Sequence, residues 1–208
     1  MDKLSPEGFA DLTDVSRETL EHLRSYAQLL RKWQKSINLV ASDSLDDLWR
    51  RHILDSAQLF PLLPTETRKL VDLGSGAGFP GLVLAIMGVP EVHLIESDIK
   101  KTVFLAEVAR TAGLQTGTNP TIHRQRIEKM AGWSTDVVTA RACAPLDRLL
   151  ILAERFIGPN TICLFLKGER IEDELTLARK QWRMVIERLP SASDPSGTIL
   201  RLGQIRRE

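Results

Sequence analysis

The sequence predicts an α/β fold with a mostly parallel, Rossmann-like sheet, an antiparallel hairpin at its C-terminal edge and a helical N-terminal extension. Three observations support this prediction: helical periodicity in the first third of the chain, short β-rich runs alternating with helical windows after residue 69, and two consecutive β-rich runs near the C-terminus. With 208 residues and 43% hydrophobic content, the chain can bury one sizeable core. We therefore expect an extension at residues 1–67 that packs on an α/β domain at residues 68–208.

Two helices are expected in the extension. Apolar residues recur at helical spacing between residues 20 and 30, and Ser16 can cap a helix that runs to about Lys35. A second helical pattern begins after Asp43 and ends at Pro61, because proline lacks the backbone N–H that a helix interior requires. The first third of the chain is thus predicted to be helical.

Strands and helices alternate in the rest of the chain. Five β-rich runs predict strands at residues 70–73, 92–95, 121–123, 137–140 and 161–166. Helical windows separate them at residues 82–87, 100–112 and 146–156. Such alternation is typical of a parallel sheet with helices on both faces. Only a polar turn separates the last two runs, 184–189 and 198–205, which predict the antiparallel edge hairpin.

The composition excludes several classes of protein. A net charge of +1 argues against a protein that holds nucleic acid chiefly by its overall charge. No apolar run approaches the length of a membrane span, and the first residues lack the pattern of a signal peptide. Cys143 and Cys163 show no CxxC spacing and no neighbouring histidine, which argues against a metal site or a disulfide framework. We expect a cytoplasmic monomer without a metal.

The most informative segment is a glycine-rich turn after the first predicted strand. Gly74, Gly76 and Gly78 follow Asp72 there, and backbone without side chains can approach a ligand closely. Phe79 occupies the place of the last glycine in the G-x-G-x-x-G fingerprint, which argues against a nicotinamide dinucleotide. Asp72 can instead place its carboxylate near a cationic group of a ligand. A tight connection without a ligand is the alternative, but crevices at the strand ends of α/β folds usually bind ligands.

A carboxylate also ends the second predicted strand. Glu96 stands where such folds hydrogen-bond the hydroxyls of a ribose. The alternative is a solvated side chain at a strand end. The glycine turn nearby favours the ribose contact.

Several segments resemble one known family. The stretch from Asp72 to Ile86, DLGSGAGFPGLVLAI, closely resembles motif I of the RsmG (GidB) family, whose members methylate guanine N7 in small-subunit ribosomal RNA. Four further segments resemble the same family: RHILDS at 51–56, ESDIKKTVFL at 96–105, RACAPL at 141–146 and LKG at 166–168. Motif I and RHILDS are the specific parts. The resemblance implies a class I methyltransferase fold, S-adenosylmethionine as cofactor, and 16S rRNA in the small ribosomal subunit as partner.

The resemblance also implies particular cofactor contacts, at Gly74, Phe79, the pair Ile127–Glu128, and Arg141. The apolar Ile127 can cover an adenine ring, whereas Glu128 taken by itself is equally compatible with a solvated charge. Cys143 departs from the family pattern. No neighbouring group in the sequence would activate it as a nucleophile, so we do not expect covalent catalysis.

Methylation of guanine N7 needs no general base, because N7 carries a lone pair at neutral pH. The site must hold N7 in line with the methyl group, and must offer guanine an acceptor on one edge and a cation on another. Arg141, at a strand end on the ligand side of the sheet, is the expected catalytic residue. Candidate substrate-binding residues are Asn38, Arg51, His52, Asp55, Ser56 and Lys167.

Structural roles are the alternatives for some of these candidates. His52 and Asp55 stand three residues apart and are equally compatible with polar contacts that fix the extension to the body. Lys167 either contacts a substrate phosphate or ends its strand in solvent.

A basic rim is the candidate surface for docking RNA beside the crevice. It comprises Arg31, Lys32, Lys35 and Arg50, with Arg51 beside them. A solvated charged face is the alternative. Trp33 and Trp49 can stack on bases, but each lies beside the apolar stripe of its helix, as core residues do.

Two other functions stay open at this stage. One is methylation of a small molecule or a protein, and the other is a non-catalytic ribosome-binding factor with this fold. Affinity for S-adenosylmethionine separates the factor from the enzymes. The class of molecule that accepts the methyl group separates the two enzymes.

Overall fold

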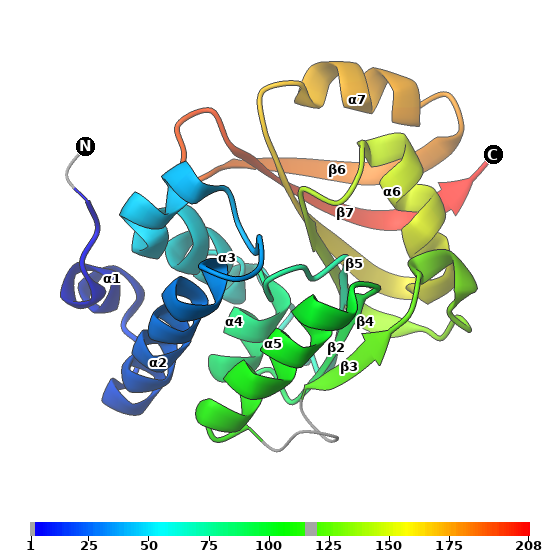
Figure 1. The fold of residues 1–208 in the computed structure, drawn as a ribbon. Coiled ribbons are helices and arrows are strands. Elements are labelled where there is room, and N and C mark those ends of the chain that lie inside the picture. Colours follow the sequence, from blue (N-terminus) through cyan, green and yellow to red (C-terminus); the bar gives the residue numbers. More distant parts are fainter. Residues whose placement is uncertain (1–2, 115–119) are drawn as a thin grey trace.

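The computed structural model describes residues 3–114 and 120–208, whose strands form one seven-stranded sheet with helices on both faces (Figure 1). The strand order is β3-β2-β1-β4-β5-β7-β6. The strands are β1 (Lys69–Leu73), β2 (Glu91–Glu96), β3 (Thr121–Arg124), β4 (Thr135–Arg141), β5 (Ile157–Lys167), β6 (Trp182–Pro190) and β7 (Thr198–Arg207). Each of the seven predicted β-rich runs lies within one of these strands.

The first five strands run parallel, and β7 pairs antiparallel with both β5 and β6. This confirms the predicted α/β fold and its edge hairpin. β5 begins four residues earlier than predicted, where Ile157 pairs with Thr135 before a register shift in β4. Gly158, Pro159 and Asn160, which are residue types typical of turns, interrupt the apolar run, so the β-rich pattern starts only at residue 161.

The helices are α1 (Pro6–Thr13), α2 (Arg17–Gln34), α3 (Asp55–Ala57), α4 (Gly81–Ile86), α5 (Ile99–Thr111), α6 (Leu146–Ala153) and α7 (Ile171–Ala178). Neighbouring residues of a strand face opposite layers. Leu70 of β1 packs with the apolar residues of α2, α4 and α5, whereas Val71 packs with those of α6 and α7. No helix among the residues described is long and apolar enough to cross a bilayer.

Two helices had no counterpart in the sequence-based prediction. At α1, the Ser5 hydroxyl accepts the Gly8 N–H at 3.0 Å and proline occupies the first helical position, as is typical of a helix start. At α7, Ile171, Leu175 and Ala178 are buried at helical spacing. Both helices have eight residues, so each offers only two turns of periodicity to detect.

The second predicted helix of the extension is divided into four short segments. They are η1 (Ser42–Asp47) and η3 (Phe60–Leu62), both 3₁₀ turns, the π-helical η2 (Trp49–Leu54), and α3. Hydroxyls compete for backbone acceptors here, since Ser44 donates to the Ala41 carbonyl and Ser56 donates to the His52 carbonyl. A π turn shifts the direction of the side chains that follow it, and such turns are frequent at functional sites.

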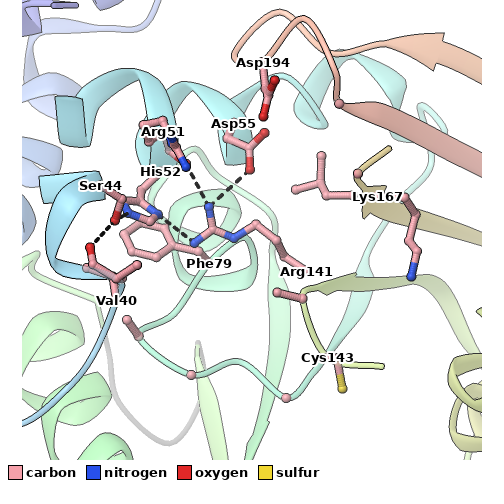
Figure 2. A pocket seen from close by; sticks show the side chains of 18 of the residues that line it. Val40, Ser44, Arg51, His52, Asp55, Phe79, Arg141, Cys143, Lys167 and Asp194 are labelled. Carbon is pink, nitrogen blue, oxygen red and sulfur yellow. Dashed lines mark hydrogen bonds and ion pairs between the residues drawn. The ribbon is translucent and has the colours of Figure 1, made fainter. Parts of the chain in front are cut away.

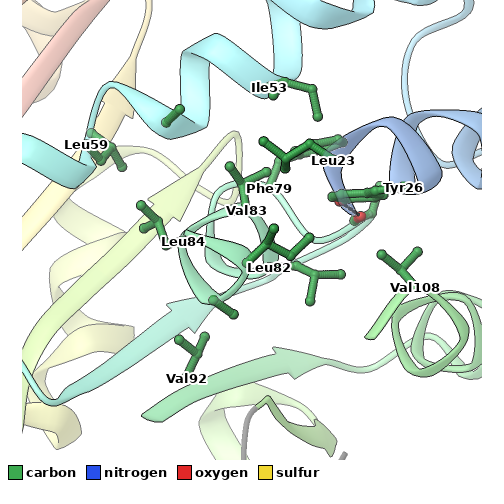
Figure 3. Close-up of a cluster of buried hydrophobic side chains, with 14 of the residues drawn as sticks. Leu23, Tyr26, Ile53, Leu59, Phe79, Leu82, Val83, Leu84, Val92 and Val108 are labelled. Carbon is green, nitrogen blue, oxygen red and sulfur yellow. Dashed lines mark hydrogen bonds between the residues drawn. The ribbon is translucent and has the colours of Figure 1, made fainter. Parts of the chain in front are cut away.

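The N-terminal helical segment shares one buried cluster with the sheet. Leu23 and Tyr26 of α2 pack with Phe79 and Leu82 in this cluster (Figure 3). The Tyr26 ring stacks on Phe79 at 5.1 Å, and its hydroxyl donates to the Ala77 carbonyl in the glycine-rich turn. The extension thus touches the predicted ligand site directly. The division of the chain at residue 67 stays a prediction.

Candidate functional site

A cavity of about 880 Å³ opens at the carboxyl edge of the parallel strands. The glycine-rich turn after β1 forms one wall, and the loop after β4 forms a second (Figure 2). The N-terminal segment, with His52 and Asp55, closes a third side. The β6–β7 loop completes the lining with Ser191, Ser193 and Asp194. This is the edge at which open α/β sheets bind their ligands.

The glycine turn has the conformation that its residues predict. Gly74 and Gly76 have φ angles of +65° and +57°, a left-handed conformation that favours glycine. A Cβ on Gly74 would lie 2.8 Å from Sγ of Cys143, so no larger residue fits there without a shift. A Cβ on Gly76 would have no neighbour closer than 3.8 Å. Both glycines line the cavity, and their missing side chains leave it open.

Asp72 and Gly78, at the two ends of this turn, do not line the cavity. Asp72 is fully buried, and its Oδ1 accepts the Thr139 hydroxyl at 2.8 Å. Burial raises the pKa of Asp72 to about 6. A Cβ on Gly78 would lie 2.7 Å from the Tyr26 hydroxyl oxygen. Contrary to expectation, neither residue is placed to touch a ligand in the cavity, because Asp72 is buried against Thr139 and Gly78 packs against Tyr26.

Glu96 lies where the prediction puts it, at the end of β2 and in the cavity wall. Its Oε2 accepts the Gly76 N–H at 2.9 Å, and its Oε1 accepts the Asp98 N–H at 2.7 Å. The carboxylate therefore fixes the glycine turn from the side of β2.

A second cavity of about 340 Å³ lies next to the first and shares Gly74, Glu96 and Cys143 with it. Ile127 and Glu128 line this second cavity. The two spaces adjoin along the glycine turn, so one elongated ligand can extend through both. The structure thus brings the predicted pair 127–128 and the glycine turn to one site.

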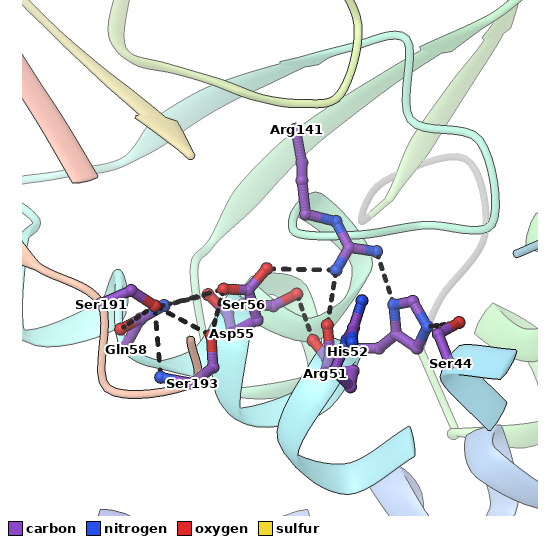
Figure 4. Close-up of polar contacts among 9 residues, drawn as sticks. All are labelled: Ser44, Arg51, His52, Asp55, Ser56, Gln58, Arg141, Ser191 and Ser193. Carbon is purple, nitrogen blue, oxygen red and sulfur yellow. Dashed lines mark hydrogen bonds and ion pairs between the residues drawn. The ribbon is translucent and has the colours of Figure 1, made fainter. Parts of the chain in front are cut away.

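Arg141 connects three parts of the chain (Figure 4). Its Nη2 lies 2.9 Å from Nδ1 of His52, and its Nη1 donates to Oδ2 of Asp55 at 3.1 Å. Nη1 also donates to the Arg51 carbonyl at 3.0 Å. The guanidinium carbon lies 4.8 Å from the centre of the Phe79 ring, as in a cation–π contact. Phe79 is 3% exposed and also stacks on His52, so it supports the cluster from below.

The hydrogen bonds of His52 assign its tautomer. Ser44 donates to the Ala41 carbonyl, so its oxygen accepts from Nε2 of His52 at 2.7 Å. Nδ1 then has no proton and accepts from Arg141. Burial lowers the pKa of His52 to about 3, and the charges of Arg141 and Arg51 contribute to the shift. The ring is therefore neutral at physiological pH and serves as an acceptor.

Asp55 links Arg141 to the β6–β7 loop. Its Oδ1 accepts the Ser193 hydroxyl at 2.5 Å and the Gln58 side-chain amide at 3.0 Å. Both carboxylate oxygens of Asp55 are thus occupied within the protein. His52 and Asp55 therefore make the polar contacts between extension and body that the sequence gives as the alternative to substrate binding. These contacts lie in the wall of the cavity.

The remaining predicted substrate residues take different positions. Ser56 is fully buried and lies outside the cavity lining. Asn38 is exposed and also lies outside it. Lys167 does line the cavity, but its Nζ lies 2.5 Å from Glu174 and donates to the Ala144 carbonyl at 3.0 Å. Lys167 therefore holds the loop after β4 in place.

Cys143 lines both cavities. Burial raises the pKa of its thiol to about 11, and the negative charges of Asp72 and Glu96 add to this shift. The thiol is protonated at neutral pH and is a weak nucleophile in that form.

Comparison with known proteins shows the family to which this chain belongs. The family model described as GidB, rRNA small subunit methyltransferase G, matches residues 19–194. The chain belongs to the GidB family. A protein from Rhodospirillum centenum named ribosomal RNA small subunit methyltransferase G is 61% identical over 191 residues, covering 92% of this chain and 87% of that protein. A protein of the same name from Rhodospirillum rubrum is 56% identical over 204 residues, covering 98% of this chain and 100% of that protein.

Solved structures outside the GidB family share the fold. M. jannaschii TYW2 in complex with AdoMet has a TM-score of 0.57 at 14% identity, covering 84% of this chain and 80% of that chain. A mutant of MtNAS in complex with S-adenosylmethionine has a TM-score of 0.55 at 16% identity, covering 96% and 84% of the two chains. These likenesses confirm the class I methyltransferase fold.

The predicted basic rim of this GidB chain lies outside both cavities. Arg31, Lys32 and Lys35 are exposed along α2 and at its end. Arg50 forms an ion pair with Asp47 at 3.2 Å. Arg51, in contrast, is exposed and lines the larger cavity.

Both tryptophans of the extension pack against other aromatic rings. Trp49 is 8% exposed and packs on Phe9 at 5.4 Å, whereas Trp33 packs on Phe104 at 5.6 Å. Trp49 is a core residue and Trp33 is half-buried against the core, as their apolar stripes suggest.

Sequence reasoning missed several residues of the GidB site. Lys101 after β2 and Arg170 before α7 line the cavity, and so do Ser191, Ser193 and Asp194. The sheet topology contains a signal for the last three. A strand antiparallel to β5 must begin at the carboxyl edge, so the loop preceding β7 falls beside the glycine turn.

Proposed function

We propose that this protein transfers a methyl group from S-adenosylmethionine to N7 of a guanine in the 16S rRNA of the small ribosomal subunit, in the cytoplasm. One observation supports this above the others. In a member of the GidB family, two adjoining cavities meet at the glycine turn, beside the cluster of Arg141, His52 and Asp55. The first cavity is wide enough for a cofactor and an unstacked base together.

The residues that are present fit the cofactor. A side chain on Gly74 would meet Cys143 and one on Gly76 would enter open space, and their positive φ angles favour glycine over larger residues. Ile127 offers an apolar surface for adenine. Glu96 lies at the position of a ribose, where each of its oxygens accepts one backbone N–H and keeps a second lone pair for a hydroxyl. S-Adenosylmethionine supplies a methyl group on a positively charged sulfur when it is bound. Arg141, Phe79 and the glycine turn then define the wall against which the base is placed.

The chemistry asks little of the protein beyond placement. Guanine N7 has a free lone pair, so no proton has to be removed before the methyl group is transferred. The neutral His52 and the protonated Cys143 agree with this, because neither acts as a base or a nucleophile at neutral pH. Holding two reactants in line can supply about 7–11 kcal/mol of the barrier reduction in favourable cases. Arg141, fixed by three contacts, is the residue that we assign to this placement.

RNA docking requires cations near the cavity. Arg51, Lys101 and Arg170 line it, and no ion pair with a described residue engages them. They join Arg31, Lys32 and Lys35 as candidate contacts to phosphate groups. We expect the protein to act as a monomer.

The test is methyl transfer with purified components. Small subunits from cells that lack this protein are incubated with it and with S-adenosylmethionine carrying a labelled methyl group. The label is expected in 16S rRNA, at a position where borohydride and aniline cleave the chain, because this chemistry is specific for 7-methylguanosine. Label in a metabolite extract or in protein instead, with none in the RNA, would contradict the proposal. Absence of cofactor binding in calorimetry would favour a non-catalytic factor.

A further inference from the structure

The acidic residues of the larger cavity differ in how many of their oxygens are occupied. Asp55 and Glu96 each use both oxygens within the protein. Glu174 uses only Oε2, which accepts the Leu146 N–H and lies 2.5 Å from Nζ of Lys167, so its charge is neutralised by an ion pair. Asp194 differs from all three, because it forms no ion pair with a described residue, and its Oδ1 accepts from Ser196 while its Oδ2 has no hydrogen-bond partner among those residues.

The β6–β7 loop holds Asp194 in a fixed place. On one side, Ser193 donates to Asp55, and the Ala192 N–H donates to the Gln58 side chain at 2.7 Å. On the other side, the Gly197 N–H donates to the Asp194 carbonyl at 2.9 Å. The loop is thus tied to the same helical segment that positions Arg141.

Asp194 lies across the cavity from the glycine turn. In Figure 2, Asp194 and Cys143 stand on opposite sides of Arg141. Cys143 lies next to the glycine turn, because a Cβ added to Gly74 would lie 2.8 Å from its Sγ. Hydrogen bonds from the Ser196 N–H and hydroxyl lower the pKa of Asp194, and the charge of Arg51 contributes. Its carboxylate is therefore ionised at neutral pH.

Guanine has two adjacent donors, N1–H and the N2 amino group, on the edge that lies away from N7. A carboxylate accepts from both at once, whereas adenine presents an acceptor at N1 and repels it. We propose that Asp194 reads this edge of the target guanine and so determines the base specificity of methylation. The inference rests on the proposed function, since it takes N7 to face the cofactor. Among the described residues that line the cavity, no other carboxylate combines an oxygen without a partner with a charge that no ion pair neutralises.

The test compares wild type with Asp194→Asn. An asparagine amide presents one donor and one acceptor, which fits the corresponding edge of adenine better than that of guanine. Small subunits that bear guanine or adenine at the target position compete for the enzyme during methyl transfer. The preference for the guanine subunits is expected to fall by about 5- to 150-fold in Asp194→Asn, the range for one bidentate base contact. Asp11→Asn, at an exposed aspartate on α1, is the matched control and should keep the wild-type preference.

Three outcomes are informative. An unchanged preference in Asp194→Asn overturns the inference, even if the rate of methylation falls. Weaker binding of S-adenosylmethionine by the variant, measured by calorimetry, assigns Asp194 to cofactor binding and also overturns it. Wild type that methylates no subunit contradicts the proposed function itself, and the base-reading role is rejected with it.

Discussion

Nη2 of Arg141 lies 2.9 Å from Nδ1 of His52, which joins the end of β4 to the N-terminal helical segment. The histidine is an acceptor in this pair because its other nitrogen donates to Ser44. A strand end and a π turn distant in sequence thereby form one wall of the site. The behaviour of this pair decides the first two predictions.

Arg141→Ala is expected to lower the rate of methyl transfer by on the order of 100-fold, because a small displacement of the reacting groups costs about that much. The free energy of unfolding should also fall by about 1–3 kcal/mol, since Asp55 and His52 lose a donor in a partly buried place. Kinetics at saturating cofactor and chemical denaturation measure the two effects. Arg110→Ala, at an exposed ion pair on α5, is the control. Full turnover by Arg141→Ala would rule out its catalytic role.

The neutral His52 should make the protein less stable in mild acid. Its pKa falls from an unfolded value near 6.5 to about 3, so between these values only the unfolded state takes up the proton. The contribution of His52 to the free energy of unfolding is therefore fully present above pH 6.5 and is lost as the pH falls toward 3. Between about pH 7 and pH 5, wild type should lose about 1–2 kcal/mol more than His52→Gln. Other groups, including Asp72, titrate in both proteins, so their effects cancel when the loss of stability of one protein is subtracted from that of the other. Equal losses would mean that His52 is not buried as a neutral ring.

Gly76→Val should abolish binding of S-adenosylmethionine while the protein stays folded. The added side chain would project into the cavity from a backbone at φ +57°, which a β-branched residue adopts poorly. Gly113→Val is the matched control, because Gly113 has φ +67° at the end of α5, outside both cavities. Calorimetry should show binding by the control alone. Normal affinity in Gly76→Val would refute the position of the cofactor.

Reversing the charges of Arg31, Lys32 and Lys35 should weaken binding of the small subunit and flatten its dependence on salt concentration. Reversal of Arg51, Lys101 and Arg170 should flatten it further, since these side chains line the cavity. Filter binding at several salt concentrations gives both slopes. If the first variant keeps the wild-type slope, the outer face of α2 does not contact RNA.

Cys143→Ala should retain methyl transfer within about threefold of wild type, because the raised pKa keeps the thiol protonated and it contributes no nucleophile. Alkylation by iodoacetamide at neutral pH should accordingly be slow in the wild-type protein. Loss of turnover without loss of cofactor binding would show that the sulfur takes part in the reaction.

Most of the fold could be predicted from local sequence patterns. The β-rich runs, the glycine turn and the edge hairpin each depend on a few neighbouring residues, and all were found. The short helices α1 and α7 were not, because two turns give little periodicity.

The site was predicted less completely, because packing decides which side chains reach the cavity. The position of Asp72 near the end of β1 predicts a ligand contact, yet Thr139 and α4 cover it. Ser56 stands beside Asp55 in the chain, but only Asp55 faces Arg141. Asp194 follows no recognisable motif and enters the site through strand order alone.

The bond from the Tyr26 hydroxyl to the Ala77 carbonyl has a practical consequence for anyone who wishes to shorten this protein. A fragment that starts at residue 68 would keep every strand, but its glycine turn would lose the hydroxyl that anchors it. The leucines of α4 beneath that turn would also lose the cover of α2 and be wetted. We therefore expect cofactor binding to depend on α2 as well as on the glycine-rich segment.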